Sequence, residues 1–329
     1  MSHHDRITHN ALELIGNTPL VHLHSFDEAS GGCRILGKCE FLSAGHSVKD
    51  RPALFMVSEA ERSGRLKPGG VVVEGTAGNT GVGVAMVCAA KGYRCILVIP
   101  ETMAREKADF ARVFGAEVVL AKKAPWGDPN HYHEIAKRIV AETPGAVLMD
   151  QFNNPANTKS HYETTGPELW EQTGGKIDAM VAGMGTSGTL IGAGTFLKQR
   201  KPDIKLIAAD PMGSVYFNLM TTGEPKAEGS SVLEGVGIGR VPGIFDGTSL
   251  DGIIRVTDAE ALAATRQIIR QEGLFVGGSA GLSVAGALKV ARQLGPGATI
   301  ITVLSDSGRN YMSKLFNDAW MKEQGLATT

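Results

Sequence analysis

From about residue 70 onward, the chain alternates short runs of β-branched and other apolar residues with longer amphipathic stretches. This alternation is typical of βα units, in which helices of about 10 to 15 residues cross over between parallel strands. Because such crossovers are right-handed, the pattern predicts a doubly wound α/β fold. Strands are predicted at VVVEG, CILVIP, EVVLA, AVLMD, IDAMVAG, KLIAAD and TIITVLS, and helices at GVGVAMVCAAKG, EKADFARVFG, YHEIAKRIVAETPG and SGTLIGAGTFLKQR.

The length of the chain predicts two domains that share a cleft. With 329 residues, 43% of them hydrophobic, it exceeds the ~250 to 300 residues at which a single core stops growing. No internal repeat and no Pro-, Gly- or Ser-rich linker divides it, so the boundary is placed near residue 155. Residues 211–257 are Gly-rich and lack a clear period, and a stretch of that kind in a compact enzyme usually borders an active site.

The charge distribution favours small-molecule partners. Lys plus Arg (33) nearly balances Asp plus Glu (34) and no run of five like charges occurs, so neither nucleic acid nor membrane is an expected partner. No stretch approaches the ~20 apolar residues that span a bilayer, and the start MSHHDRITHN does not resemble a signal peptide, so a cytoplasmic location is expected. The cysteines form no CxxC pair and the paired histidines lie in polar segments, so neither disulfides nor a metal site is expected.

A glycine-rich turn after the fifth predicted strand has the features of an anion site. The strand ends at Gly183 and runs through Gly185–Thr189 into a helical pattern. Glycines let backbone N–H groups approach an anion, hydroxyls add donors, and the helix N-terminus adds the positive end of its dipole. The same glycines spell GxGxxG, and Asp210 follows about where a ribose-binding acid would stand. Three interpretations stay open at this point: the phosphate of a compact cofactor, a dinucleotide, or a structural turn.

Lys49 is a candidate for covalent chemistry. It stands between Ser47 and Asp50 and leads directly into an apolar helical pattern. A lysine at the mouth of a cleft, partly withdrawn from water, is the side chain that forms Schiff bases. Taken alone, the same lysine also fits a solvated position in a charged KDR cluster.

Two further turns place small polar residues at helix starts. Thr76–Thr80 follows the strand VVVEG and supplies more donors than an ordinary N-cap requires, which favours a carboxylate ligand. Gly277–Gly281 puts Ser279 at the start of another helix, either for tight helix packing or beside a pyridine ring. A hydroxyl at the ring nitrogen would leave that nitrogen unprotonated and weaken the electron sink, which suits β-elimination better than transamination.

Five motifs occur in order along the chain: IGNTPLV at 15–21, SVKDR at 47–51, TAGNTG at 76–81, GTSGT at 185–189 and GGSAG at 277–281. Taken together, they resemble the β-family, or fold type II, of pyridoxal-phosphate enzymes, and within it the cysteine synthases and cystathionine β-synthases. The resemblance extends from about residue 8 to about residue 325.

The resemblance implies two doubly wound αβα domains with the cofactor in the cleft between them. The smaller domain is expected at residues 41–155 and carries a mobile loop for the substrate carboxylate. The larger domain is expected at residues 1–40 plus 156–329 and carries the phosphate loop. A homodimer is implied as well, whereas binding of a serine acetyltransferase stays open.

Roles for individual residues follow from the same resemblance. Lys49 is expected to hold pyridoxal 5′-phosphate and to act as the catalytic base, Asn79 to bind the cofactor's 3′-oxygen, and Ser279 to face the pyridine nitrogen. Gly235 matches a backbone position that faces the substrate amine. The phosphate loop corresponds to Gly185, Thr186, Ser187, Gly188 and Thr189, and the substrate carboxylate site to Thr76, Ala77, Gly78, Thr80 and Gln151.

The chain departs from the family pattern at two places. Residues 43–46 read Ser-Ala-Gly-His, where the family has Asn-Pro-Gly-Gly or a similar run, and His46 fits either the surface or the cleft. Ala77 stands where the carboxylate loop usually has a serine. Without that hydroxyl one hydrogen bond to the substrate is in doubt, and affinity or substrate choice is expected to differ.

The activity implied is β-replacement on an O-activated L-serine. In a cysteine synthase, Lys49 would remove the α-proton of O-acetyl-L-serine, acetate would leave, and sulfide would add to the resulting α-aminoacrylate. Cystathionine β-synthase, which joins serine and homocysteine, is the main alternative, because DPMGS at 210–214 and DSGRNYMSK at 306–314 resemble its core equally well. A serine or threonine dehydratase, a dinucleotide-dependent dehydrogenase and a non-catalytic protein on the same fold are further alternatives, and the leaving group stays open.

Overall fold

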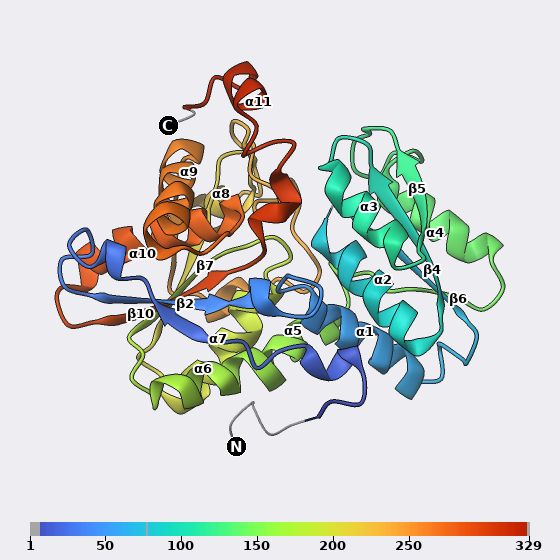
Figure 1. Cartoon of the computed structure of the whole chain (residues 1–329), viewed down its shortest axis with the longest axis horizontal. Helices are drawn as coiled ribbons and strands as arrows, with labels where there is room; N and C mark the ends of the chain where they lie inside the picture. Colours follow the sequence, from blue (N-terminus) through green and yellow to red (C-terminus); the bar gives the residue numbers. More distant parts are fainter. Residues whose placement is uncertain (1–6, 77, 328–329) are drawn as a thin grey trace.

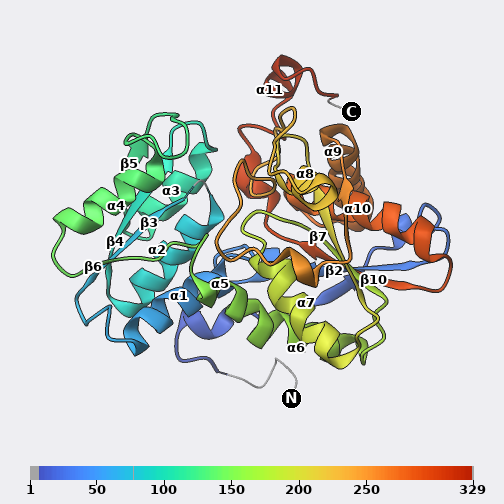
Figure 2. The same cartoon turned by 180° about the vertical axis from the view of Figure 1, so that it is seen from behind.

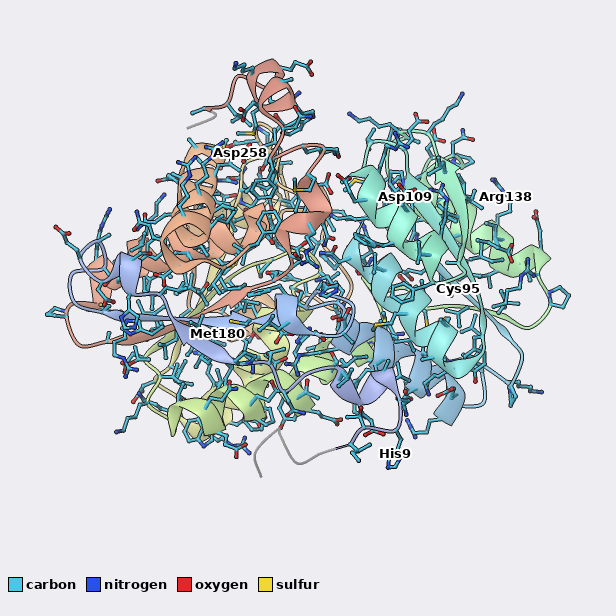
Figure 3. The ribbon with its side chains drawn as sticks, viewed as in Figure 1. His9, Cys95, Asp109, Arg138, Met180 and Asp258 are labelled. Atoms are coloured by element: carbon cyan, nitrogen blue, oxygen red, sulfur yellow. The ribbon has the colours of Figure 1, made fainter. Side chains whose placement is uncertain are left out.

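The computed structural model describes residues 7–76 and 78–327. It has two halves that lie side by side, each built on its own sheet, and the view from behind shows the same separation (Figure 1, Figure 2). Apolar side chains fill the interior and charged ones lie at the surface: Met180 is buried inside the larger half, whereas Asp109 and Arg138 project from the periphery of the smaller one (Figure 3). Within the described residues, no helix is both long and apolar enough to cross a bilayer.

Among the described residues, the smaller sheet has four parallel strands in the order β5-β4-β3-β6. Helices α1, α2 and α3 pack on one face and α4 on the other, and the central strands are continuous apolar runs because both faces are covered. The strands are β3 (Val71–Gly75), β4 (Arg94–Pro100), β5 (Glu117–Ala121) and β6 (Ala146–Leu148); the helices are α1 (Asp50–Arg62), α2 (Asn79–Lys91), α3 (Arg105–Val113) and α4 (Tyr132–Glu142).

The larger sheet, over the same described ranges, has six strands in the order β1-β2-β10-β7-β8-β9, and only β1 is antiparallel to its neighbour. Successive residues of a strand face opposite sides of the sheet, so Val181 packs with α9 and α10 while Met180 packs with α6 and α7. The strands are β1 (Leu20–His22), β2 (Arg34–Cys39), β7 (Ala179–Gly183), β8 (Lys205–Asp210), β9 (Gly252–Arg255) and β10 (Thr299–Leu304); the helices are α6 (Gly166–Thr173), α7 (Gly188–Arg200), α9 (Asp258–Gln267) and α10 (Gly278–Leu294).

Shorter elements complete the chain. Three more α-helices are α5 (Pro155–Ser160), α8 (Tyr216–Thr222) and α11 (Asp318–Glu323) in the described part. The 3-10 turns are η2 (Ala11–Leu14), η3 (His24–Phe26), η4 (Glu40–Leu42), η6 (Gly247–Ser249) and η8 (Gly308–Tyr311), and two π-helical segments are η5 (His161–Thr165) and η7 (Ile268–Glu272).

The predicted fold class is confirmed, since both sheets carry helices on their two faces. All seven predicted strands and all four predicted helices form, with ends shifted by a few residues. The sequence did not predict β1, β2 and β9, and residues 211–257, expected to be irregular, contain α8 and β9. The domain boundaries stay a prediction.

Two connections hold the halves together near the start of α1. The Val48 N–H donates to the Ser305 carbonyl at 2.8 Å, and Ser47 pairs with Asp306 in an isolated bridge. Two residues after Lys49, Arg51 pairs with Glu40 after β2 and with Glu168 of α6. The start of α1 is therefore fixed against the larger half.

Candidate active site

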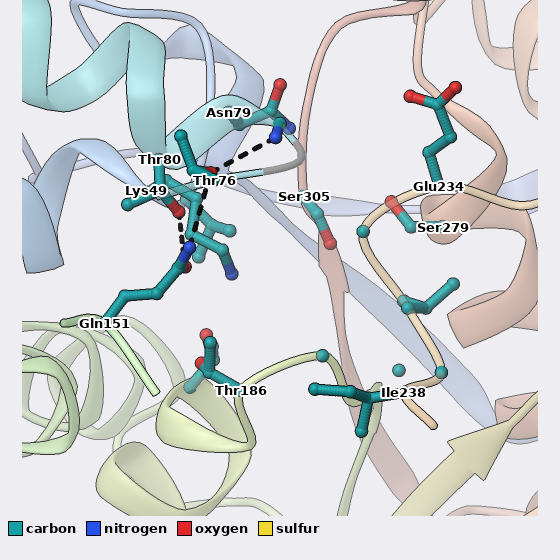
Figure 4. Close-up of a pocket in the computed structure, with 18 of the residues that line it drawn as sticks. Lys49, Thr76, Asn79, Thr80, Gln151, Thr186, Glu234, Ile238, Ser279 and Ser305 are labelled. Carbon is teal, nitrogen blue, oxygen red and sulfur yellow. Dashed lines mark hydrogen bonds between the residues drawn. The ribbon is translucent and has the colours of Figure 1, made fainter. Parts of the chain in front are cut away.

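A cavity lies between the two halves, at the carboxyl ends of parallel strands. Turns after β3, β6, β7 and β10 all reach it, as expected for an open α/β sheet. Figure 4 shows Lys49, Thr76, Thr80 and Gln151 grouped on one side, with Ser279 across from them. The predicted site residues that line it are Lys49, Thr76, Gly78, Asn79, Thr80, Gln151, Gly185, Thr186, Ser187, Thr189, Gly235 and Ser279.

Lys49 is held at the N-cap of α1 with its side chain largely withdrawn from water. The approach of α2 to its backbone depends on Gly83, where a Cβ would stand 3.1 Å from the Lys49 carbonyl oxygen. Burial lowers the pKa of Lys49 to about 8, although the Asp306 carboxylate acts in the opposite direction. The amine is therefore neutral far more often near neutral pH than the amine of an exposed lysine, and the neutral form can act as nucleophile or base.

The turn after β3 and the turn after β6 meet through side chains. The Thr80 hydroxyl donates to Gln151 Oε1 at 2.6 Å, and Gln151 Nε2 donates to Thr76 Oγ1 at 3.3 Å. These three side chains are buried and lie at the start of α2, where backbone N–H groups of the first turn lack intrahelical partners. Together with those N–H groups, the three side chains offer hydrogen-bond donors of the kind that a carboxylate ligand accepts.

Asn79 is oriented by a network that the sequence did not predict. Its Nδ2 donates to Asp306 Oδ2 at 2.6 Å, and its Oδ1 accepts from Asn310 Nδ2 at 3.2 Å. The Tyr311 hydroxyl donates to the same Asp306 oxygen at 2.5 Å. Burial raises the pKa of Asp306, while the charge of Lys107 and the hydrogen bonds that the Asp306 carboxylate accepts act against that rise. The turn after β10 thus places the amide of Asn79 toward the cavity.

The turn after β7 is the one for which the sequence predicts an anion cradle. Ser187 takes the left-handed region with φ of 73°, and α7 begins at the next residue, Gly188. Gly185 leaves room for the neighbouring loop, because a Cβ there would lie 2.6 Å from the Gly235 carbonyl oxygen. The Tyr216 hydroxyl donates to the Gly185 carbonyl at 2.8 Å. Gly188 does not itself line the cavity, but it supplies the helix start whose N–H groups face the turn.

A buried histidine supports one hydroxyl of this cradle. The Nε2 of His161 lies 3.2 Å from Thr189 Oγ1, and its Nδ1 lies 2.9 Å from Thr165 Oγ1. Burial, together with the charges of Arg51 and Lys49, holds the pKa of His161 well below its ordinary value. A neutral imidazole therefore fixes Thr189 without adding charge.

A charged pair at the cavity was also missed by the sequence analysis. Lys107 of α3 and Glu234 approach to 2.7 Å, and Lys314 binds the other oxygen of Glu234 at 2.6 Å. Burial would raise the pKa of Glu234, but the two lysines hold it below its ordinary value. The long irregular stretch was expected to border the site and does so through Glu234 to Ile238. No local pattern identified its partner on α3.

Three sequence interpretations have a definite outcome. His46 is exposed, so it lies at the surface. The Asp210 carboxylate is buried and does not line the cavity; its Oδ2 accepts the Phe217 N–H at 3.1 Å and lies 3.5 Å from Arg255, so the ribose interpretation loses its acid. Ala77, predicted for the substrate carboxylate, lies outside the described residues.

Comparison with known proteins gives the family. The family model described as "Pyridoxal-phosphate dependent enzyme" matches residues 11–306. The chain belongs to this family. A cysteine synthase of Emericella nidulans is 43% identical over 319 residues, which cover 95% of this chain and 86% of that protein. Cystathionine β-synthase of Oryctolagus cuniculus is 42% identical over 323 residues, covering 98% of this chain and 58% of that protein, and a cysteine synthase of Dictyostelium discoideum is 38% identical, covering 98% and 88%.

Pyridoxal phosphate, the cofactor of this family, fits the residues of the cavity. The glycines of the β7 turn leave a cradle with hydroxyls at Thr186, Ser187 and Thr189, suited to a phosphate. The Lys49 amine faces the same cavity and has the lowered pKa that Schiff-base formation requires. Ser279 lies across from it at the start of α10 and brings a hydroxyl rather than a carboxylate to the cavity.

Proposed function

We propose that this enzyme is a cysteine synthase, which converts O-acetyl-L-serine and sulfide to L-cysteine and acetate, and that it works as a cytoplasmic homodimer. The observation that carries the proposal is the position of Lys49 between two different anion sites, the cradle after β7 and the donor group of Thr76, Thr80 and Gln151. Several of its relatives carry the name cysteine synthase, at about 40% identity over nearly the whole chain.

Each residue has a defined task in this proposal. When bound, pyridoxal phosphate withdraws electrons from Cα of the substrate and so makes the α-proton acidic. The neutral Lys49 amine accepts that proton and later returns it to Cα. Thr76, Thr80 and Gln151 hold the substrate carboxylate, which aligns the Cα–H bond with the amine. Closure of the loop around residue 78 over the bound carboxylate would exclude water during the reaction.

The remaining predicted residues hold the cofactor. Asn79, oriented by Asp306, is assigned to the 3′-oxygen and Ser279 to the pyridine nitrogen. Gly185 to Thr189 are assigned to the phosphate. Gly235 has φ of 81° and lines the cavity, so its backbone can face the substrate amine.

The test is a spectrum followed by a product assay. Adding O-acetylserine to the holoenzyme should shift the visible absorbance band of the cofactor to longer wavelength, and sulfide should restore the starting band while L-cysteine accumulates. Ping-pong kinetics are expected, because the first product leaves before the second substrate reacts. An unchanged band with O-acetylserine, together with product formation from serine and homocysteine, would reject the proposal in favour of the alternative.

Cystathionine β-synthase is a second candidate, favoured by the charged pair at the cavity. A sulfide nucleophile needs no ionic partners, whereas an amino-acid thiol carries an ammonium and a carboxylate that Glu234 and Lys107 could pair with. If this enzyme uses homocysteine, Glu234→Gln should reduce kcat/KM for homocysteine at least about tenfold, the loss of one charge-assisted hydrogen bond. The same variant should leave kcat/KM for sulfide nearly unchanged.

A further inference from the structure

A cluster of metal-ligating side chains lies outside the active site, at the N-terminal edge of the larger sheet. It consists of His22, His24 and Asp27. His22 ends β1, and Leu23 between the two histidines is completely buried. The chain leaves the strand at Leu23 and turns into η3 at His24, and the two imidazole rings lie beside each other with their centroids 3.8 Å apart. The 3-10 turn η3 then brings Asp27 back beneath them, with its N–H donating to the His24 carbonyl at 3.1 Å.

The distances within the cluster suit one small cation. His22 Nε2 lies 2.8 Å from Asp27 Oδ1, His24 Nδ1 lies 3.4 Å from Asp27 Oδ2, and all the ligand atoms lie within 4.8 Å of one another. Ligands about 2.0 to 2.2 Å from a tetrahedral zinc ion are themselves about 3.3 Å apart. Small side-chain rotations therefore bring the three atoms to bonding distance, and a water molecule would complete the tetrahedron.

The turn that carries the cluster is anchored to the rest of the half. The Ser25 N–H donates to Glu272 Oε1 at 2.6 Å, and Gln267 Nε2 donates to the Ser25 carbonyl at 2.7 Å. Gln267 ends α9 and Glu272 ends η7, so the backbone of η3 is held from a distant part of the chain. Such anchoring positions the ligands before the ion arrives, which reduces the entropy lost on binding.

The cluster is separate from the catalytic cavity. His22 pairs with Leu36 near the start of β2, and β2 runs parallel to β10. Ser305, which lines the cavity, follows the end of β10. The two sites thus lie at opposite ends of the strands of this sheet, and changes in the cluster do not touch the catalytic residues.

We infer that His22, His24 and Asp27 form a binding site for a divalent transition metal, with zinc as the best fit. Two imidazole nitrogens and one carboxylate oxygen match zinc and its neighbours nickel, cobalt and copper. They do not match magnesium or calcium, which prefer ligand sets made of oxygen. The sequence analysis expected no metal site, because it considered only the histidine pairs at residues 3–4 and 131–133.

The experiment is equilibrium dialysis of the full-length holoenzyme against micromolar zinc, with bound metal measured by mass spectrometry. The reference protein carries His3→Ala and His4→Ala, because these adjacent histidines at the start of the sequence offer a rival site. It should bind one zinc ion per chain. His24→Ala should lower the affinity at least about tenfold, since loss of an outer-sphere partner alone costs about 10- to 100-fold. Its side chain is 72% exposed, so folding is not at risk.

Matched controls separate this cluster from other ligands. Asp27→Asn should weaken zinc binding, whereas Glu28→Gln, at the next and exposed position, should not. His9→Ala is the corresponding control for His24→Ala, since His9 is exposed and outside the cluster. Zinc should also raise the thermal midpoint of the reference protein but not that of His24→Ala. Equal zinc binding by the reference protein and the cluster variants, or no binding by the reference protein, would overturn the inference.

Discussion

Replacing Arg51 with methionine should be among the most destabilising single changes in the chain. The Arg51 side chain is 1% exposed and binds Glu40 Oε2 at 2.8 Å and Glu168 Oε1 at 2.6 Å. Methionine has a similar length but no charge, so Glu40, which is fully buried, keeps only the Thr18 hydroxyl at 2.7 Å. Glu168 retains Lys38 at 2.6 Å.

The magnitude follows from the carboxylate that is left without its partner. Breaking a buried ion pair by removing one member costs about 3 to 5 kcal/mol, because the other charge stays buried and uncompensated. At about 2 to 4 °C per kcal/mol for chains of roughly this size, the thermal midpoint should fall by roughly 6 to 20 °C. The assay is thermal unfolding of the holoenzyme followed by circular dichroism.

The pH dependence provides an independent check. In the native protein burial would raise the pKa of Glu40, but the charge of Arg51 keeps it below the ordinary value, so this group adds stability above its unfolded pKa and loses it in acid. Without Arg51, burial dominates and the folded pKa rises above the unfolded value. Folding then requires a protonated Glu40, and the difference in stability between the two proteins should grow from pH 5 to pH 7.

A matched variant on the same helix tests the reasoning. Arg62→Ala removes another ion-paired arginine of α1, but its partner Glu59 is solvated and the pair is exposed. Its midpoint should not change measurably. Adding Glu40→Gln to Arg51→Met should recover part of the loss, since no carboxylate is then left unpaired. A midpoint for Arg51→Met equal to that of Arg62→Ala, or a loss that does not depend on pH, would refute the argument.

Three further results are expected. Lys49→Ala should abolish both turnover and the visible absorbance band of the cofactor while the far-ultraviolet dichroism stays native; turnover without added amine would contradict the assignment of the base. Thr80→Val should lower kcat/KM for the amino-acid substrate about 10- to 100-fold, mainly through KM, because Gln151 loses its 2.6 Å donor and the substrate carboxylate loses a hydroxyl worth about 1.5 to 3 kcal/mol. Cofactor uptake by the cofactor-free enzyme should accelerate as pH rises through about 8, where the Lys49 amine becomes neutral. Asp306→Asn should move that midpoint to lower pH, since the Asp306 carboxylate raises the Lys49 pKa. An acceleration only near the pKa of a free lysine would contradict the burial of Lys49.

Local sequence patterns were sufficient to predict the alternating strands and helices and the glycine-rich turns between them. The seven predicted strands combine β-branched composition with polar or glycine-rich ends, and each forms as a strand. Turns such as Gly185–Thr189 depend on residues close together in sequence, so the cradle was also visible locally. β1 and β9 are edge strands of three and four residues, and β2 lies between the 3-10 turns η3 and η4 rather than between helices, so none of them has the pattern from which the other strands were predicted.

The sequence by itself determined the α/β class, the order of the βα units, the turns that reach the cavity and the presence of Lys49 in its lining. Only the tertiary structure decided which polar and charged side chains of the two halves contact each other. Asn79 and Asp306 are 227 residues apart, Lys107 and Glu234 are 127 apart, and Arg51 and Glu168 are 117 apart. Such contacts arise from how the two sheets pack, and hydrophobic periodicity reports only the neighbours within a strand or helix. The same holds for His22, His24 and Asp27, whose side chains converge only because the chain turns through η3 directly after β1.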